Sequence, residues 1–282
     1  GPIIPPSIPM VLYALVSKAS IGSLFLAGIL PGLIMGLVLM IMNYYMAGKR
    51  GFAMEDPIPL RELPRKTANA FPALLMPVIL LYGIYGGVTT PTEAAAIAAF
   101  YALLLAGLFY KALSFKTLFN VFVESARSSA SVGIVIGGAF ILNFIVISEQ
   151  IPQSIAMLLE GTDVNPIVFL IVVNLLILAL GCILDATTII LVIVPLFIPT
   201  CEVLGIDLVH FGVLVVVNSM IGLITPPYGI LLFVINAVTD IPLREIISEI
   251  WAFLVILIAA LLIMLLVPDL VLWLPRVFGY QG

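Results

Sequence analysis

Two adjacent prolines inside a long apolar segment are the residues of this sequence that most directly suggest chemistry. The segment, residues 213–238, contains Gly222-Leu223-Ile224-Thr225-Pro226-Pro227-Tyr228-Gly229. Because proline has no backbone N–H, the two prolines should leave the carbonyls of Gly222 and Leu223 without their helical partners. Inside a bilayer, an unpaired carbonyl is tolerated only where protein, water or an ion satisfies it. Unwound helices of this kind form the ion and substrate sites of many secondary transporters.

The chain opens with a second copy of this motif, Gly1-Pro2-Ile3-Ile4-Pro5-Pro6-Ser7, and both copies read Gly-x-Ile-x-Pro-Pro. A single copy is equally well explained by a proline kink that only shapes a helix, but two matched copies favour a functional break. We therefore predict that residues of both breaks bind an ion or substrate. They are Gly1, Ile3, Pro5, Ser7, Gly222, Ile224, Thr225, Pro226 and Gly229.

Asp185 is the acid that most needs an explanation, because it interrupts the apolar run of residues 167–198. A carboxylate at the centre of a membrane span costs roughly 2.5–3.5 kcal/mol on insertion scales and needs a partner. The neighbouring apolar segments hold no Lys or Arg, which leaves a cation, protonation or a helix N-terminus. Thr187 and Thr188 add hydroxyl oxygens beside it, and an all-oxygen set with one carboxylate suits a monovalent cation such as Na⁺ better than calcium.

We predict that Asp185, Thr188 and Thr225 bind Na⁺, with the hydroxyl of Thr187 beside them. The structural alternative is that Asp185 caps the helix that follows it, through the amides of Thr187 or Thr188. Capping and ion binding are compatible with each other.

A second acid, Glu93, closes the turn-like stretch Gly86-Gly87-Val88-Thr89-Thr90-Pro91-Thr92. Thr90 precedes a proline and is pushed out of helical geometry, so a helix should start here. For Glu93, a place in a capping box is favoured over ion binding. His210 is predicted at a helix start that faces the exterior, where capping or solvent is the default. Four isolated asparagines at membrane depth more often join helices than bind ligands: Asn143, Asn174, Asn218 and Asn236.

The composition is that of a membrane protein. Of the 282 residues, 63% are hydrophobic and 9% are charged, against about 25% charged in soluble domains, and the mean hydropathy is +1.31. The net charge of -4 is small, and without a basic patch it excludes nucleic acid as a partner. The sequence also lacks a second deep acid, a nucleophile elbow, a zinc-ligand set and a phosphate-binding loop, so enzyme functions are disfavoured. Cys182 and Cys201 indicate neither a disulfide framework nor a metal site.

Charges in the loops orient the predicted spans. The loop of residues 48–69 is rich in Lys and Arg and should face the cytoplasm, whereas the loops at 148–165 and 199–207 hold none and should be external. Two external loops cannot flank a single crossing, so residues 167–199 are predicted to form a re-entrant hairpin with its tip near residues 181–188. The remaining predicted helical segments are 8–16, 24–45, two within 71–108, 118–147 and 251–267.

The two proline breaks should lie on helices that run in opposite directions. The helix through Pro5-Pro6 leads outward from the break, whereas the helix through Pro226-Pro227 runs inward. Matching motifs in opposite directions are typical of an inverted repeat, whose binding site lies near the midplane of the membrane. Because the first residue is a Gly inside a motif, we expect the chain to be part of a longer protein.

These stretches resemble the large membrane (M) subunit of tripartite ATP-independent periplasmic (TRAP) transporters. The matching residues follow the family's order over nearly the whole chain. They are Gly1-Pro-Ile-Ile-Pro-Pro-Ser7, Gly87-Val-Thr-Thr-Pro-Thr-Glu-Ala94, Gly181-Cys-Ile-Leu-Asp-Ala-Thr-Thr188 leading to Pro195, Leu204-Gly-Ile-Asp, His210-Phe-Gly-Val and Gly222-Leu-Ile-Thr-Pro-Pro-Tyr-Gly229. At Tyr228 a smaller residue is often met in relatives, so the match is weaker there.

The resemblance implies an all-α, polytopic, elevator-type importer in a bacterial or archaeal cytoplasmic membrane, here without its N-terminal part. It would be driven by Na⁺ as the coupling ion, with no other cofactor. It would work with a small membrane subunit (Q type) and an extracytoplasmic solute-binding protein that delivers a small organic acid, such as a C4-dicarboxylate or a sialic acid. A divalent-anion/sodium symporter that acts without a binding protein is the alternative.

The resemblance also implies where the sodium sites lie and which parts of the chain move. One site is expected at Asp185, Thr187 and Thr188 with the backbone of Gly181 and of residues 222–229, and the other at Gly1 to Ser7. The expected parts are 1–22 (half of the first broken helix, transport domain), 23–164 (mainly scaffold helices and the cytoplasmic loop), 165–240 (hairpin and second broken helix, transport domain) and 241–282 (C-terminal scaffold helix).

Overall fold

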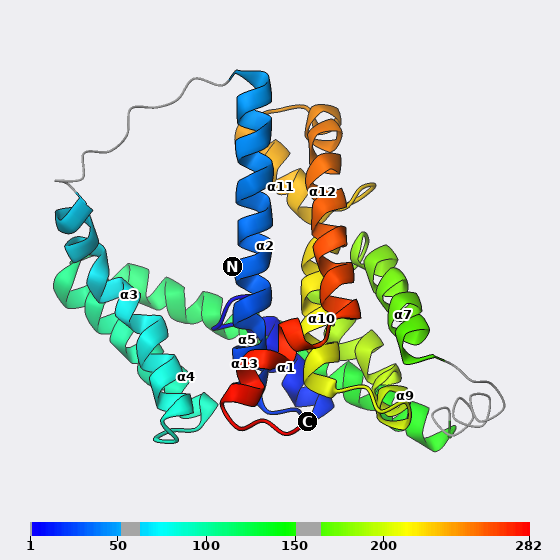
Figure 1. Cartoon of the computed structure of the whole chain (residues 1–282). Coiled ribbons are helices and arrows are strands. Elements are labelled where there is room, and N and C mark those ends of the chain that lie inside the picture. The colour runs from blue at the N-terminus through cyan, green and yellow to red at the C-terminus, as the bar shows by residue number, and fades with distance from the viewer. Residues whose placement is uncertain (1, 52–62, 151–164) are drawn as a thin grey trace. The chain divides into compact units, whose positions relative to one another are not determined.

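The computed structural model describes residues 2–51, 63–150 and 165–282, and within these ranges every regular element is a helix (Figure 1). This confirms the all-α prediction. The elements are α1 (Ile8–Ser17), α2 (Ile21–Arg50), α3 (Leu63–Tyr85), α4 (Pro91–Leu104), η1 (Leu105–Phe109), α5 (Phe115–Ser148), α7 (Pro166–Gly181), α8 (Ala186–Thr188), η2 (Ile189–Ile193), η3 (Val194–Leu196), α9 (Ile198–Val203), α10 (Leu208–Gly222), α11 (Ile230–Thr239), α12 (Leu243–Leu266) and α13 (Asp269–Val277).

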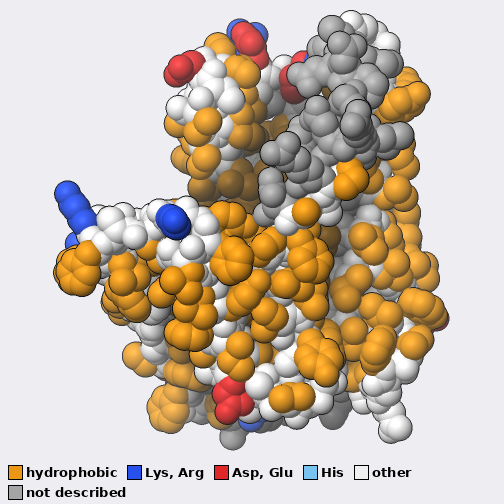
Figure 2. Space-filling model, turned by 90° about the vertical axis from the view of Figure 1, so that its left-hand side faces the viewer, with side chains coloured by type: hydrophobic (Ala, Val, Ile, Leu, Met, Phe, Trp, Pro, Cys, Tyr) orange, Lys and Arg blue, Asp and Glu red, His pale blue; other side chains and the backbone are white. Residues whose placement is uncertain are grey.

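Within the described ranges, four helices are long and apolar enough to cross a membrane: Ile21–Arg50, Pro91–Phe109, Phe115–Ser148 and Leu243–Leu266. Hydrophobic side chains cover most of the face shown in Figure 2, as expected for a surface that meets lipid. The chain is therefore a multi-pass membrane protein. It separates into two compact units, residues 1–46 with 132–282 and residues 47–131.

The smaller unit contains the antiparallel pair α3 and α4, joined by the turn at residues 86–90. The Thr89 N–H donates to the carbonyl of Gly83 (3.1 Å) and closes this turn. The Tyr101 hydroxyl donates to the carbonyl of Pro72 (2.8 Å) and links the two helices. The prediction that two helices meet at this turn is confirmed.

In the larger unit, α7 and the segments from α8 to α9 form a hairpin. Asn165 caps α7 by accepting a hydrogen bond from the N–H of Ile167 (2.9 Å). Near the open end, the ring of Phe169 on the first arm lies edge-on to the ring of Phe197 on the return arm, with centroids 6.4 Å apart. Both arms therefore start and end at the same level, which confirms the predicted hairpin shape, with the turn between Gly181 and Ala186 inside the predicted tip of residues 181–188. That the hairpin enters and leaves the membrane on one side stays a prediction.

Helix α10 lies at the centre of the larger unit and is buried along almost its whole length. It packs along α7, and α12 runs antiparallel to it, because the imidazole Nε2 of His210 near its start lies 3.0 Å from the carbonyl of Met264 near the end of α12. His210 lies at a helix start, as predicted, but the expectation that it meets solvent is wrong: the residue is only 2% exposed, because the end of α12 covers the first turn of α10.

One end of the larger unit gathers three segments, of which the end of α1 and the turn between α9 and α10 were predicted to be external. The end of α1, the turn between α9 and α10, and the last residues of the chain line one hollow there, and Figure 1 places them at the same end. Burial and the neighbouring Asp207 carboxylate raise the pKa of Tyr280 in this tail to about 12. The phenol therefore stays protonated at neutral pH.

The two proline breaks are followed by matching backbone structure. Each Pro-Pro bond is cis, and each pair leads into a helix of 10 residues, α1 or α11. Each of these helices ends at a left-handed residue, Lys18 (φ 59°, ψ 14°) and Asp240 (φ 57°, ψ 13°). A long helix then follows, α2 or α12. Because α1 runs toward the end that holds the last residues of the chain and α11 runs away from it (Figure 1), the two helices run in opposite directions, as the sequence motif predicts.

Candidate functional site

The stretch between α10 and α11 is not helical, as the two prolines predict. The carbonyls of Gly222 and Leu223 nevertheless have partners: Gly222 accepts from the N–H of Thr225 (2.9 Å) and Leu223 from the N–H of Leu231 (3.1 Å). The prediction that these two carbonyls are left unpaired is therefore wrong. The chain tightens into a turn after Gly222, and an N–H from the first turn of α11, which has no partner within its own helix, reaches back to Leu223.

Carbonyls without a hydrogen-bond partner among the described residues, here called open carbonyls, follow directly after Leu223. Those of residues 224–228 accept no backbone or side-chain hydrogen bond from any residue that the structure describes. The same holds for the carbonyls of residues 181–184 at the hairpin tip. Each carbonyl oxygen carries two lone pairs, so both stretches offer oxygen atoms that are free to accept a ligand.

A contact between two glycines brings these stretches together. A Cβ built on Gly181 would lie 3.1 Å from the Cα of Gly222, and a Cβ built on Gly222 would lie 2.7 Å from the Cα of Gly181. Only two residues without side chains allow so close an approach of backbones. The hairpin tip therefore rests on the end of α10, immediately before the break.

Asp185 caps the short helix α8, which is the structural alternative considered above. Its Oδ2 accepts from the N–H groups of Thr187 (2.9 Å) and Thr188 (3.2 Å), and its Oδ1 accepts from the hydroxyl of Thr188. An ionised carboxylate has about four acceptor sites, so these three bonds leave capacity for a cation. The side chain is exposed on the surface of the described chain, and its role in ion binding stays a prediction.

The predicted sodium ligand Thr225 does not hydrogen-bond to Asp185 or Thr188. Its hydroxyl donates to the carbonyl of Ile221 (2.7 Å), one turn back along α10. The hydroxyl groups of Thr225 and Thr188 thus each donate a hydrogen bond within their own segment. Their oxygens keep lone pairs, which are the atoms that a cation binds.

The first proline break differs from the second in having a side-chain cap on the helix that follows it. The Ser7 hydroxyl caps α1 by accepting from the N–H of Met10 (3.3 Å) and donates to the carbonyl of Pro2. The carbonyl of Ile3 lies against α2, where a Cβ on Gly28 would come within 2.7 Å of it. Pro5 is buried, and the remaining predicted residue of this break, Gly1, lies outside the described residues. At the second break, by contrast, Gly229 gives α11 no side-chain cap.

Glu93 forms a capping box, as predicted. Its carboxylate accepts from the backbone N–H (2.8 Å) and the hydroxyl (2.9 Å) of Thr90, and the Thr90 hydroxyl accepts from the N–H of Glu93 (3.3 Å). These bonds give the acid a complete structural role at the start of α4.

We expect Glu93→Ala to lower the stability of the protein without changing the Na⁺ dependence of uptake. Loss of the capping partner should cost about 1 kcal/mol, seen as a lower melting temperature in detergent. Glu93→Gln keeps a side-chain acceptor for the N–H of Thr90 and is the matched control, expected to melt close to the unmodified protein. A changed Na⁺ dependence in both variants would show that Glu93 acts on the ion instead.

The predicted structural role of the asparagines is confirmed for one pair. The Asn218 side-chain amide donates to the backbone carbonyl (2.6 Å) and the side-chain oxygen (3.0 Å) of Asn174, and so joins α10 to α7. Asn236 donates to the carbonyl of Ile241 (2.7 Å) and closes the turn before α12. The side chain of Asn143 lies outside the described residues.

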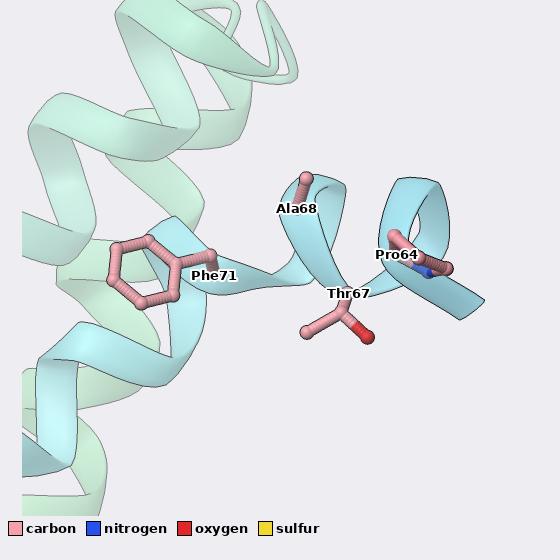
Figure 3. Close-up of a pocket in the computed structure, with 4 residues that line it drawn as sticks. All are labelled: Pro64, Thr67, Ala68 and Phe71. Carbon is pink, nitrogen blue, oxygen red and sulfur yellow. The ribbon is translucent and has the colours of Figure 1, made fainter.

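Two further features of the described residues bear on the choice of site. No three His, Cys, Asp or Glu side chains among them are placed to hold a metal. A hollow in the smaller unit is lined by Pro64, Thr67, Ala68 and Phe71 of α3 (Figure 3). None of these four described residues carries a charged or titratable side chain. The oxygen-rich meeting point of hairpin and break is the candidate site.

Comparison with known proteins gives a consistent family. The model of the tripartite ATP-independent periplasmic transporter, DctM component, matches residues 1–270. The chain is 40% identical over 281 residues to the sialic acid TRAP transporter large permease protein SiaM of Vibrio cholerae, covering 99% of this chain and 66% of the relative. It is 40% identical over 279 residues to the C4-dicarboxylate TRAP transporter large permease protein DctM of Pseudomonas aeruginosa, covering 99% of this chain and 65% of the relative.

A third relative has a combined name, DctMQ. The isethionate TRAP transporter permease protein DctMQ of Oleidesulfovibrio alaskensis is 39% identical over 269 residues, which cover 95% of this chain and 42% of that protein. The chain spans about two thirds of the length of the first two relatives.

Proposed function

The chain belongs to the family of large membrane subunits of TRAP transporters, and on that premise we propose that it is part of a sodium-coupled importer of small organic acids in a bacterial or archaeal cytoplasmic membrane. The observation that carries the sodium part is the meeting of Gly181 with Gly222. This contact places two stretches of open carbonyls beside one another, next to the carboxylate of Asp185.

The physical reason for coupling lies in the repulsion between these oxygens. Carbonyl dipoles and a carboxylate that face one another at short range repel in a medium of low dielectric constant. A bound Na⁺ removes that repulsion and holds the hairpin tip against the break. The domain that carries the hairpin then crosses with ion and substrate together, and each elementary charge moved contributes about 2.3 kcal/mol per 100 mV of membrane potential.

The substrate class is proposed from the relatives. Their printed names give sialic acid, C4-dicarboxylate and isethionate at 40%, 40% and 39% identity. At nearly equal identity the named substrates differ, and what they share is an acidic group on a small organic molecule. We infer that this chain handles an acid of that class, and that the choice among acids is made mainly by a separate extracytoplasmic binding protein.

The proposed partners follow the family. A small membrane subunit of the Q type is supported by the relative whose name combines M and Q. The solute-binding protein would dock from outside and deliver the acid. The lipid bilayer surrounds the apolar helices described above.

Uptake by the reconstituted full-length transporter tests the proposal. We expect a radiolabelled acid to enter vesicles only when an inward Na⁺ gradient and the soluble binding protein are both present. Replacing Na⁺ by K⁺ should reduce uptake to the level of empty vesicles. Na⁺-driven uptake that is equally fast without the binding protein would favour the alternative, a divalent-anion/sodium symporter.

A further inference from the structure

The contact between α7 and α10 is apolar except at one point. On α7, Leu170 and Ile177 lie four residues before and three after Asn174, and on α10, Leu214 and Ile221 are spaced in the same way around Asn218. This spacing puts each set on one helix face, and all four aliphatic side chains are buried. In a membrane, burial of such aliphatic surfaces adds little driving force of its own, because lipid is as apolar as they are, so hydrogen bonds and close packing set the offset between the helices.

The Asn174–Asn218 pair supplies such hydrogen bonds. The amide of Asn218 donates to two oxygens of Asn174, at 2.6 Å and 3.0 Å, and the amide of Asn174 donates to the carbonyl of Leu170 (2.8 Å). The two side chains are 0% and 6% exposed. These are the side-chain hydrogen bonds between α7 and α10 among the described residues, and both helices must sit at one offset for them to form.

The offset fixed by this pair is also the one that the candidate ion site needs. Gly222 follows Asn218 by four residues, about 6 Å along α10 at 1.5 Å per residue. There it meets Gly181 of α7. Sliding one helix along the other by a single turn, about 5.4 Å, would separate the carbonyls of the hairpin tip from those of the break.

We propose that Asn174 and Asn218 set the register between the hairpin and the second broken helix, and thereby position the oxygens that bind the coupling cation. They act as positioning residues and do not touch the ion. The proposal rests on the proposed sodium-coupled function for its transport readout. It explains why two polar side chains are buried in an otherwise aliphatic contact between α7 and α10.

The test compares Asn218→Leu with Ser219→Ala in the full-length transporter. Ser219 is the neighbouring residue, is equally buried, and its hydroxyl has no hydrogen-bond partner among the described residues, so its removal leaves the register intact. We expect Asn218→Leu to raise the Na⁺ concentration for half-maximal uptake by about tenfold, the usual size of an effect on metal affinity from a group that orients the ligands. The rate at saturating Na⁺ should change little, and Ser219→Ala should match the unmodified protein in both quantities.

A double variant separates positioning from stability. In Asn174→Leu with Asn218→Leu, no partner is left unpaired, so the melting temperature should equal or exceed that of the unmodified transporter. Its apparent Na⁺ affinity should still be reduced about tenfold. Restoration of normal Na⁺ affinity together with stability would overturn the proposal, as would an Asn218→Leu variant with unchanged Na⁺ affinity or a Ser219→Ala variant with the same defect.

A distance measurement tests the register even if uptake proves independent of Na⁺. Spin labels at the exposed positions Leu176 on α7 and Tyr228 in the break, in a background with Cys182 and Cys201 replaced by Ser, report the offset directly. We expect Asn218→Leu to shift or broaden the distance distribution by several ångströms, and Ser219→Ala to leave it unchanged. Identical distributions in all three proteins would refute the register role. If uptake by the unmodified protein does not depend on Na⁺, that result contradicts the proposed function and leaves the register role standing.

Discussion

Asp185→Asn is expected to abolish Na⁺-dependent uptake while the protein still folds and inserts. Asparagine caps helices about as well as aspartate, so the bonds from the N–H groups of Thr187 and Thr188 can persist, whereas the charge and the Oδ1 acceptor of the Thr188 hydroxyl are lost. Removing one charge of a close pair typically costs 2–5 kcal/mol, so the initial rate at a fixed Na⁺ concentration should fall by about 100-fold or more. Reconstituted uptake and the melting temperature measure the two effects separately.

Asp207→Asn is the matched control. Asp207 caps α10 in the same way, with Oδ1 accepting from the N–H groups of Val209 (2.8 Å) and His210 (2.9 Å), but it lines the external hollow and not the candidate site. The same substitution there should leave the Na⁺ dependence within about twofold, because no charge near the site has changed. If Asp185→Asn behaves like Asp207→Asn, then Asp185 is a helix cap alone.

The main features of the fold follow from local signals in the sequence. Proline pairs end helices whatever surrounds them, so both breaks are predictable from residues 1–7 and 222–229. The absence of Lys and Arg from both loops that flank residues 167–199 is enough to predict the re-entrant hairpin. The capping box of Glu93 depends on residues three apart and is likewise local. The division of the chain into moving and static parts stays a prediction.

The features that could not be predicted from the sequence depend on residues that are distant along the chain. His210 looks like a helix-start residue, and its burial follows from the end of α12, more than fifty residues later, lying over it. The paired carbonyls of Gly222 and Leu223 depend on the chain tightening and turning back after them. The contact between Gly181 and Gly222 is the clearest case, since each glycine on its own is compatible with an ordinary helix end.

The two halves of the inverted repeat share a backbone but differ at their breaks. Ser7 caps α1 and is almost completely buried, whereas Gly229 leaves the start of α11 without a side-chain cap and Tyr228 beside it is exposed. The carbonyls of residues 3–6, like those of residues 224–228, accept no hydrogen bond from a described residue. Both breaks therefore keep open backbone oxygens, and they differ in the side-chain cap of the helix that follows.

Gly222→Ala is expected to disable the site by steric means alone. The new Cβ would lie 2.7 Å from the Cα and 2.8 Å from the carbonyl carbon of Gly181, and backbone atoms have no rotamer by which to move away. The hairpin tip must therefore shift by about an ångström, and a misplacement of that size typically costs about 100-fold in activity. Helix propensity acts in the opposite direction, since Ala is about 1 kcal/mol better than Gly within a helix, so a loss of uptake would have to come from the contact.

Gly36→Ala controls for the change of residue type. Gly36 lies within α2, and a Cβ there would have nothing within 4 Å, so only the gain in helix propensity remains and the melting temperature should stay the same or rise slightly. Uptake and Na⁺ dependence should not change in this variant. Normal Na⁺-driven uptake by Gly222→Ala would mean that transport does not require the hairpin tip to rest on the end of α10. In that case the carbonyls of the tip and of the break would have to serve separate sites, because one ion spans oxygens of both stretches only while the two backbones touch.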